Sequence, residues 1–404
     1  MSGFRLLALT GAIAIALNGC VTTQSGSTIA TDGDEPIPRL TAAAAPGARP
    51  DLKSDEAGLR MMYDKAEAGM QTSGALIRDP ELNQYISDLV CKLAKEYCAE
   101  IRVYIIRAPY FNATMGPNGA MQVWSGLLLR VRNEAQLATV LGHEIGHYLK
   151  RHSVERMRNV VATSNGLAFF QLAMAGAGVG FIGAVGQLVA MAELTAYNRD
   201  QEREADLFGH QFLVEHEYDP YQAAKIWENL REEQKADGDD DSKSLFLASH
   251  PLPNERRETL DKLAQRTDAS VINWETGQDR YNAALRKHRK TYLQDELQLR
   301  RFDRFEALLE MLLKDGVNTG ELRFFLGEIH RLRNEGSDME TAQRHYEQAL
   351  KDGGAPAEIY RSMGQVHQKS GMPAKAKASY KRYLELAPNS TDAKMIEHLM
   401  RTMS

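Results

Sequence analysis

The sequence His-Glu-Ile-Gly-His at residues 143–147 is the feature that most constrains this chain. Asn133 can cap a helix upstream of it, and apolar residues then recur near the helical period. On such a helix His143 and His147 lie one turn apart on the same face, so both imidazoles can bind one metal ion. Glu144 is then placed to act on a metal-bound water as a general base. The alternative is an exposed helix face with two unrelated histidines.

A charged stretch at residues 198–209 can complete such a site. Two histidines need a third protein ligand to hold a catalytic zinc ion, with the fourth position left to water. Glu202 and Asp206 are one helical turn apart and can supply a ligand and a carboxylate that orients a histidine N–H. The alternative is a solvated, charged helix start, because such runs are common on protein surfaces.

The N-terminus predicts export and a lipid anchor. Residues 1–19 combine Arg5 with an apolar run too short to span a membrane, which is typical of a signal peptide. The residues before Cys20 resemble a bacterial lipobox, which implies acylation of Cys20; an ordinary secretory signal is the alternative. With Val21 after the cysteine, similarity to known lipoproteins favours the outer membrane, facing the periplasm. Residues 20–53 are rich in Thr, Ser, Ala, Gly and Pro, and we expect a flexible tether there.

Cys91 and Cys98 would share an oxidising compartment, which permits a disulfide. Seven residues along one straight helix separate two Cα atoms by about 10 Å, which is too far for the bond. A disulfide therefore requires the helix that starts at Pro80 to end near Lys95, with the chain turning back before Ile101. Two separate small core thiols are the alternative.

Three β-rich runs before the metal-binding motif predict strands: residues 101–106, 111–115 and 121–124. A Gly-Pro-Asn-Gly turn joins the last two into a hairpin. In metallopeptidases an edge strand at this place can pair with an extended substrate through main-chain hydrogen bonds. The candidate residues are Asn112, Ala113 and Thr114. A hairpin that only packs on the helix is the alternative.

Residues 160–192 are almost free of charge and rich in Ala, Gly, Val, Phe and Met. Their uninterrupted apolar core, residues 172–186, is shorter than a comfortable bilayer span. We expect a buried or interfacial helical hairpin bordering the cleft, and a transmembrane helix is the alternative.

The motif at residues 143–147, followed by Glu-x-x-Ala-Asp-x-x-Gly at residues 202–209, resembles the HtpX and type I CAAX prenyl protease family of zinc metallopeptidases. The chain looks like the periplasmic, BepA-like branch of that family. The resemblance covers roughly residues 55–265 and includes the strand at Asn112 and the Ser-His-Pro sequence at residues 249–251.

The resemblance implies one zinc ion per chain, with three ligands: His143, His147 and Glu202. Glu204 is the rival carboxylate, but the family places the ligand four residues before the aspartate, which selects Glu202. Glu144 would be the general base, and Asp206 would support a ligand from behind.

Two later residues gain an expected role from the same resemblance. In BepA-like proteins the histidine that matches His250 can occupy the open zinc position and silence the enzyme, so His250 is a candidate switch ligand. The alternative is a loop histidine without a special role. Arg256 matches a family arginine near the cleft and is a candidate to stabilise an oxyanion.

From about residue 282 the pattern is almost entirely helical. Three residues recur at the 34-residue period of tetratricopeptide repeats, because Ala342, Tyr346 and Ala349 match Ala376, Tyr380 and Tyr383. Residues 282–404 therefore predict a tetratricopeptide-like domain, whose concave groove binds peptides or protein surfaces. A generic helical bundle is the alternative.

The predicted fold is mainly α with a small β-sheet: a zincin-type (gluzincin) peptidase domain at residues 54–270, then an α-helical solenoid. By resemblance, we expect a lipid-anchored periplasmic zinc metalloendopeptidase that acts on misfolded or stalled outer-membrane proteins, with repeats that recruit substrates or dock on the β-barrel assembly machinery. The alternative is a non-enzymatic chaperone or assembly factor that acts through its repeats. The formal net charge is −5 without a large basic block, which argues against nucleic acid as the main partner.

Overall fold

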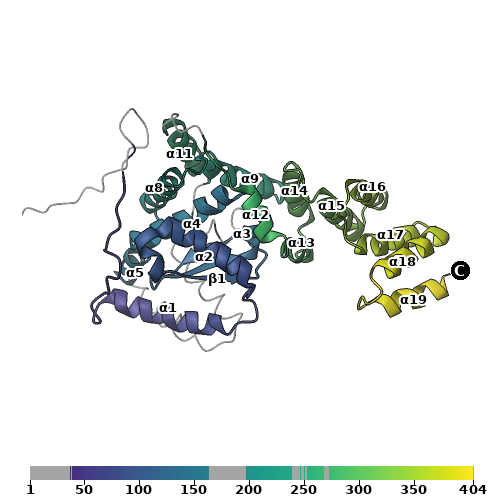
Figure 1. Ribbon diagram of the computed structural model, residues 1–404, viewed down its shortest axis with the longest axis horizontal. Coiled ribbons are helices and arrows are strands. Elements are labelled where there is room, and N and C mark those ends of the chain that lie inside the picture. The colour runs from purple at the N-terminus through teal and green to yellow at the C-terminus, as the bar shows by residue number, and fades with distance from the viewer. Residues whose placement is uncertain are drawn as a thin grey trace, which may run out of the picture.

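The computed structural model describes residues 37, 39–162, 197–238, 246, 250, 253–267 and 273–403. The expected signal peptide, Cys20 and residues 163–192 of the apolar segment lie outside the described residues. Two lobes are visible in Figure 1: a larger N-terminal lobe around the sheet, and an arm of helices that carries the C-terminus away from it. None of the helices in the described part of the chain has both the length and the apolar character that a membrane span requires.

The N-terminal lobe is mainly helical around a small sheet, as predicted. Its helices are α1 (Asp55–Gln71), α2 (Pro80–Ala94), the 3-10 helix η1 (Lys95–Glu100), α3 (Ser125–Arg130), α4 (Glu134–Leu149), α5 (His152–Ala162), α8 (Arg199–Glu215), α9 (Gln222–Ala236) and α11 (Pro253–Arg266).

The sheet has three strands in the order β1-β3-β2: β1 (Arg102–Ile106), β3 (Ala120–Trp124) and β2 (Ala113–Met115). Strands β2 and β3 form the predicted antiparallel hairpin, and β1 pairs with β3 in parallel. Strand β2 therefore lies at an edge of the sheet, and its other side is not paired with any strand of the described residues.

Helix α4 carries the His-Glu-Ile-Gly-His motif through the centre of the core, and nearly all its residues are buried. Asn133 caps it by accepting a hydrogen bond from the Gln136 N–H at 2.9 Å. The Gln136 side chain does not return that bond to Asn133; it accepts from the N–H of Arg132, one residue earlier. The cap thus fixes the start of α4 nine residues before its first motif histidine.

Helix α8 crosses α4 at very short range because small residues face each other at the crossing. A Cβ added to Gly146 would lie 2.9 Å from the Cβ of Phe208 and 3.1 Å from the Cα of Ala205. One added to Gly142 would lie 3.2 Å from the Cα of Gly209. This close approach brings the acidic start of α8 to the histidines of α4.

The end of α2 has the geometry that a disulfide requires. The helix ends at Ala94, and Lys95 adopts a φ of 51°, which turns the chain back into η1. As a result the Cα atoms of Cys91 and Cys98 are 4.6 Å apart, and their sulfur atoms form a disulfide.

The prediction of a flexible tether is wrong for residues 39–48, which are bound to the N-terminal lobe. The Ala43 N–H donates to the Leu149 carbonyl at the end of α4, at 2.8 Å, and the Leu40 N–H donates to the Gln211 side chain of α8. The Tyr97 hydroxyl donates to the Ala44 carbonyl at 2.7 Å. Small residues let this segment lie close enough to satisfy its main-chain groups on neighbouring elements, which composition alone does not reveal.

The arm consists of α12 (Gln278–Leu285), α13 (Arg289–Gln298), α14 (Phe302–Leu313), α15 (Thr319–Arg333), α16 (Asp338–Asp352), α17 (Glu358–Lys369), α18 (Pro373–Leu386) and α19 (Ala393–Thr402). Helices α15 and α16 pack as one pair, and α17 and α18 as another. All six residues of the predicted repeat are buried. In both pairs a glycine of the first helix lies against a tyrosine ring of the second: Gly327 against Tyr346, and Gly364 against Tyr380.

Candidate active site

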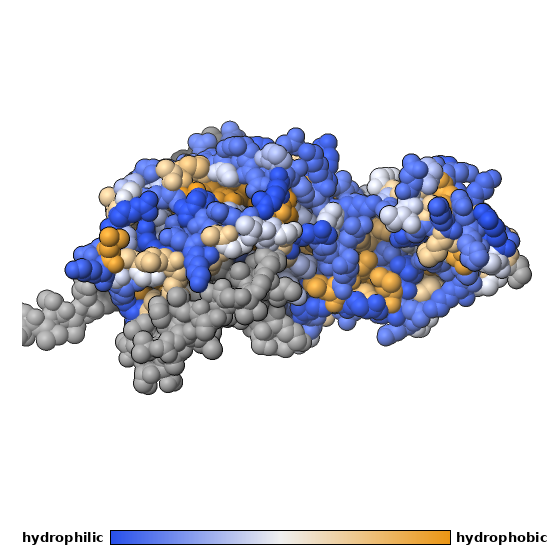
Figure 2. Space-filling view, turned by 90° about the horizontal axis from the view of Figure 1, so that it is seen from below, coloured by the Kyte–Doolittle hydropathy of each residue, from blue (hydrophilic) through white to orange (hydrophobic). Residues whose placement is uncertain are grey.

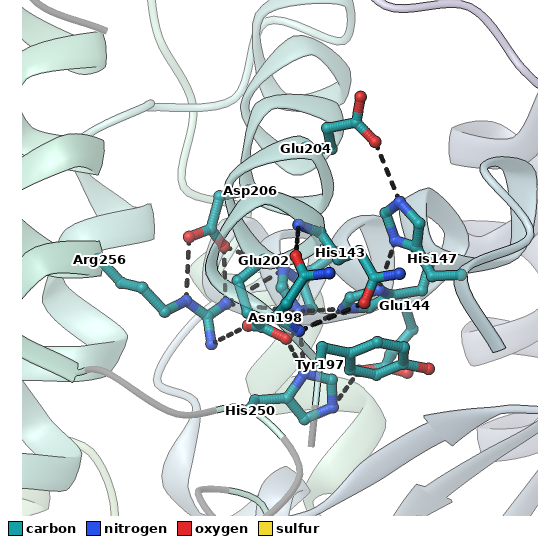
Figure 3. A network of polar contacts seen from close by, with 12 residues as sticks. His143, Glu144, His147, Tyr197, Asn198, Glu202, Glu204, Asp206, His250 and Arg256 are labelled. Carbon is teal, nitrogen blue, oxygen red and sulfur yellow. Dashed lines mark hydrogen bonds and ion pairs between the residues drawn. The ribbon is translucent and has the colours of Figure 1, made fainter. Parts of the chain in front are cut away.

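Four buried side chains from separate parts of the chain meet beside the sheet (Figure 3): His143 and His147 from α4, Glu202 from the first turn of α8, and His250. One nitrogen or oxygen atom of each lies within 4.8 Å of the others. The Nε2 atoms of the two α4 histidines are 3.0 Å apart. Glu202 oxygens lie 3.6 Å from His143 Nε2 and 3.4 Å from His147 Nε2.

This donor set fits a zinc ion. Atoms bound tetrahedrally to zinc at about 2.1 Å lie roughly 3.4 Å apart, close to the separations among these three side chains. If both rings carry their proton on Nδ1, the two facing Nε2 atoms present lone pairs that a shared cation can bind. Glu202 and not Glu204 belongs to this cluster, as the family spacing implied.

Burial keeps both α4 histidines neutral, which is the state that binds a metal. It lowers the pKa of His143 to about 4, and the Arg256 charge adds to the effect. The pKa of His147 falls well below its ordinary value, first through burial and then through His143. Burial alone would raise the pKa of Glu202. The electrostatic interactions with His250, Arg256 and His143 are stronger, and they hold the Glu202 pKa well below its ordinary range.

Asp206 orients His143 from behind, as expected. Its carboxylate lies 2.9 Å from His143 Nδ1, which favours the tautomer with the proton on Nδ1 and with Nε2 free for a metal. Arg256 then binds Asp206 with Nε and Nη2, at 2.9 and 2.6 Å, and Glu202 with Nη1, at 3.0 Å. The guanidinium also lies over the Trp227 ring. Arg256, expected as an oxyanion donor, is thus positioned to hold two carboxylates in place.

His147 has a support of its own that the sequence reasoning missed. Its Nδ1 lies 2.8 Å from Nδ1 of His152, and His152 Nε2 lies 3.0 Å from Glu204. If His147 binds a metal through Nε2, its Nδ1–H donates to His152, which in turn donates to Glu204. The only signal in the sequence is a third histidine five residues after His147.

Glu144 lies beside the cluster, but its carboxylate belongs to no group of potential metal ligands among the described residues. Burial raises its pKa to about 7, with His250 opposing and Glu202 reinforcing the shift. Its Oε1 lies 3.4 Å from His250 Nε2. His250 Nδ1 points the other way, 3.2 Å from His143 Nε2 and 2.9 Å from Glu202, at the place where a fourth ligand would stand.

A narrow cleft opens next to Glu144. The edge strand contributes Thr114 and Met115 to its lining, and the site contributes Glu144 and His250. Of the other two edge-strand candidates, Ala113 is fully buried in the sheet and Asn112 is 3 % exposed. Further lining residues, which the sequence reasoning did not single out, are Tyr63, Glu67 and Met70 from α1, Gln122 from β3, Arg156 from α5, and Tyr197.

A buried helix with two histidines one turn apart, a glutamate ligand from a second helix and an unliganded glutamate facing a cleft define a zincin-type metallopeptidase site. Residues 76–264 match the family model described as Peptidase family M48, so this part of the chain is similar to that family of metallopeptidases.

Curated relatives agree with the family. The chain is 29 % identical over 226 residues to a β-barrel assembly-enhancing protease of Escherichia coli O157:H7, which covers 54 % of the chain and 45 % of the relative. It is 31 % identical over 196 residues to the protein of that name from Yersinia pestis, covering 46 % and 40 %. The mitochondrial metalloendopeptidase OMA1 of Arabidopsis thaliana is 30 % identical over 171 residues, covering 42 % and 33 %. The chain thus spans less than half the length of these relatives.

Proposed function

We propose that this protein is a zinc metalloendopeptidase that cleaves extended segments of misfolded or stalled envelope proteins. The observation that carries this proposal is the buried cluster of His143, His147 and Glu202, with Glu144 turned to a cleft that the edge strand borders. Bound zinc would polarise the scissile carbonyl and activate a water. The similarity to β-barrel assembly-enhancing proteases supports outer-membrane proteins as the substrate class.

Strand β2 would bind the substrate, and Glu144 would transfer the protons. The outer edge of strand β2 pairs with no strand of the described residues, so an extended peptide of any sequence can add to it through main-chain hydrogen bonds and reach Glu144. Glu144 takes a proton from the attacking water and passes it to the amine of the leaving peptide. Burial raises the pKa of this carboxyl group, which makes it a better proton acceptor.

His250 is proposed as a switch. In the structure its Nδ1 stands where a fourth ligand would stand, so it competes with substrate and water for that position. Its departure would open the site. We assign no oxyanion role to Arg256. Its guanidinium is held by Asp206 and Glu202, lies over the Trp227 ring and has Nη2 3.1 Å from His143 Nδ1.

We also propose where the protein is located and which partners it binds. The lipobox at Cys20 supports a lipid anchor in the outer membrane with the enzyme in the periplasm, where the Cys91–Cys98 disulfide is stable. The two helix pairs with matching glycine–tyrosine contacts support tetratricopeptide repeats, which would recruit substrates or dock on the β-barrel assembly machinery.

The deciding experiment compares proteolysis by the wild type, Glu144→Gln and His250→Ala on a misfolded outer-membrane barrel protein. Glu144→Gln should keep one zinc per chain and lose cleavage, and His250→Ala should cleave faster than the wild type. Full activity in Glu144→Gln would overturn the mechanism, and unchanged activity in His250→Ala would overturn the switch.

A second candidate function is a chaperone or assembly factor that acts through its helical arm, which the paired helices α15–α18 favour. It predicts that Glu144→Gln complements a deletion of the gene, whereas a chain lacking residues 320–404 does not. Loss of complementation by Glu144→Gln would exclude it.

A further inference from the structure

Arg156 is a buried cation in the cleft beside Glu144, and it has no counter-ion among the described residues. It lies on α5 and is 9 % exposed, and its Nη1 has no hydrogen-bond partner in the part of the chain that the structure describes. It lines the same cleft as Thr114 of the edge strand. A guanidinium removed from water without a carboxylate to receive it is costly, so a structural role is a poor explanation for it.

The stacking around Tyr197 places Arg156 close to the metal ligands. The His147 and Tyr197 rings stack with centroids 3.7 Å apart. The Arg156 guanidinium lies 3.9 Å from the centre of the Tyr197 ring. One face of the ring is covered by His147, so the arginine occupies the other face. A single aromatic ring therefore separates this cation from a metal ligand.

The carboxylates that border the cleft do not neutralise Arg156. Glu67 is engaged with Arg102, at 2.6 and 2.7 Å, and with Asn118. Glu144 has His250 at 3.4 Å and forms no ion pair with Arg156 in the described residues. The Tyr197 ring face offsets only part of the cost of burying the guanidinium. Arg156 thus lines the cleft that a substrate would enter and keeps a hydrogen-bond donor that no described residue receives.

We propose that Arg156 forms a subsite for an acidic side chain of the substrate, next to the scissile bond. This inference rests on the proposed peptidase function. A peptide that adds to β2 sends alternate side chains to the same face of the sheet, so one of them can enter the cleft. A carboxylate is the group that a planar guanidinium binds best, through two parallel hydrogen bonds. An endopeptidase substrate continues past the site on both sides, so the carboxylate is an Asp or Glu side chain.

The test measures binding rather than cleavage, with the zinc-loaded full chain carrying Glu144→Gln. The probes are extended peptides with acetylated and amidated ends, identical except for one Asp or Asn moved along the sequence. At one position the Asp peptide should bind at least about tenfold more tightly than the Asn peptide, because hydrogen bonds between charged groups are the strong ones. Arg156→Met should reduce that ratio below about twofold, and Arg156→Glu should favour Lys at the same position.

Arg158→Met is the matched control. Arg158 lies on the same helix, but it is exposed and bonds to Asp55 at 2.7 Å, so its loss should leave the preference intact. Arg156→Met should not lower the melting temperature, because it removes a buried charge that has no counter-ion.

Equal binding of all Asp and Asn peptides, no binding of any peptide, or a preference that survives Arg156→Met would overturn the subsite. So would a preference confined to peptides with a free C-terminal carboxylate. If the preference holds but the protein with Glu144 intact cleaves nothing, the proposed peptidase function fails and the subsite stands.

Discussion

Each α4 histidine of the site has one neighbour outside the ligand set that favours the tautomer with the proton on Nδ1. His143 is held by Asp206, and His147 is held by His152, which is held by Glu204. The two supports differ in kind. The Asp206 carboxylate contacts His143 directly, whereas the Glu204 carboxylate contacts His147 only through the His152 ring. The support of His147 therefore involves two residues, His152 and Glu204, and each can be substituted separately.

We expect His152→Ala to weaken zinc binding by about tenfold to a hundredfold, because groups that orient metal-bound histidines contribute that much affinity. Glu204→Gln still accepts a hydrogen bond from His152 and should lose less. Competition with a coloured chelator measures both affinities. Arg151→Ala is the control, because Arg151 bonds to Glu56 and not to the site. Zinc affinity of His152→Ala within twofold of the wild type would show that His152 does not support His147.

A second buried histidine predicts how stability depends on pH. Burial lowers the pKa of His210 to about 4. Its Nε2 lies 3.1 Å from the Thr267 hydroxyl, and its Nδ1 has no hydrogen-bond partner among the described residues. The unfolded chain would bind a proton near the ordinary pKa of 6.5, so between pH 6.5 and 4 it binds more protons than the folded chain. The free energy of unfolding should therefore fall as the pH drops through this range.

His210→Gln should make that fall shallower, because Gln keeps a donor for Thr267 and does not titrate. Denaturant unfolding at several pH values from 7 to 4.5 measures the slope. The exposed His398, changed to Gln, should keep the slope of the wild type. A His210→Gln slope equal to that of the wild type would contradict the prediction.

At the scale of elements, the crossing of α4 and α8 decides whether a site exists. The histidines lie on one helix and Glu202 on the other, so the spacing of the two helices sets the distance between ligands. Gly142 and Gly146 allow that spacing. The motif therefore needs glycine at its fourth position for packing, independently of any chemistry.

Gly146→Ala should weaken zinc binding and destabilise the protein by about 1–3 kcal/mol, because the new methyl group meets the α8 backbone. Gly58→Ala is the control: it also lies inside a helix, but a Cβ there meets nothing within 4 Å. That change should be neutral or stabilise by up to about 1 kcal/mol through helix propensity. Thermal unfolding and zinc competition of the two variants give the comparison. If both alanines stabilise the protein, α8 has room to move and the packing argument fails.

Periodicity and spacing predicted the elements of the site but not their contacts. The helical pattern after Asn133 and the turn at residues 116–119 are local signals, and both elements formed as expected. The need to bridge Cys91 and Cys98 predicted where α2 ends, because it is a distance constraint. Tyr197 and Arg156 were missed, since their roles depend on which helices meet around the cleft. The segment at residues 39–48 was misjudged for the same reason, because its partners lie far away in the sequence.

At the scale of the whole molecule, the apolar residues of the main core form one continuous cluster, whereas those on the surface that Figure 2 shows do not. On the face drawn in Figure 2, hydrophilic residues cover most of the described surface, and apolar residues form small separate groups. The main core, by contrast, runs without a break from α2 and α4 into α13–α16 of the arm. A boundary near residue 282 is visible in the sequence as a change of pattern, but no change in packing marks it in the structure.

A network of buried ion pairs also connects the N-terminal lobe to the arm. Arg130 of α3 is 3 % exposed and bonds to Glu233 of α9 at 2.8 Å and to Glu296 of α13 at 2.9 Å. Glu296 also bonds to Arg304 of α14. Next to it, Asp295 binds the half-exposed Arg107 in a more solvated pair.

Glu296→Ala should destabilise the protein by about 3–5 kcal/mol, because it leaves two arginines without their shared carboxylate. Asp295→Ala is the matched control, one residue away on the same helix, and should cost at most about 1 kcal/mol because Arg107 remains hydrated. Scanning calorimetry should show one transition for the wild type and for Asp295→Ala, since the shared core unfolds as a unit. In Glu296→Ala the arm should melt in a separate, earlier transition. A single transition at the wild-type temperature in Glu296→Ala would mean that the apolar core alone joins the arm to the lobe, and that the repeats would stay fixed relative to the cleft without this charge cluster.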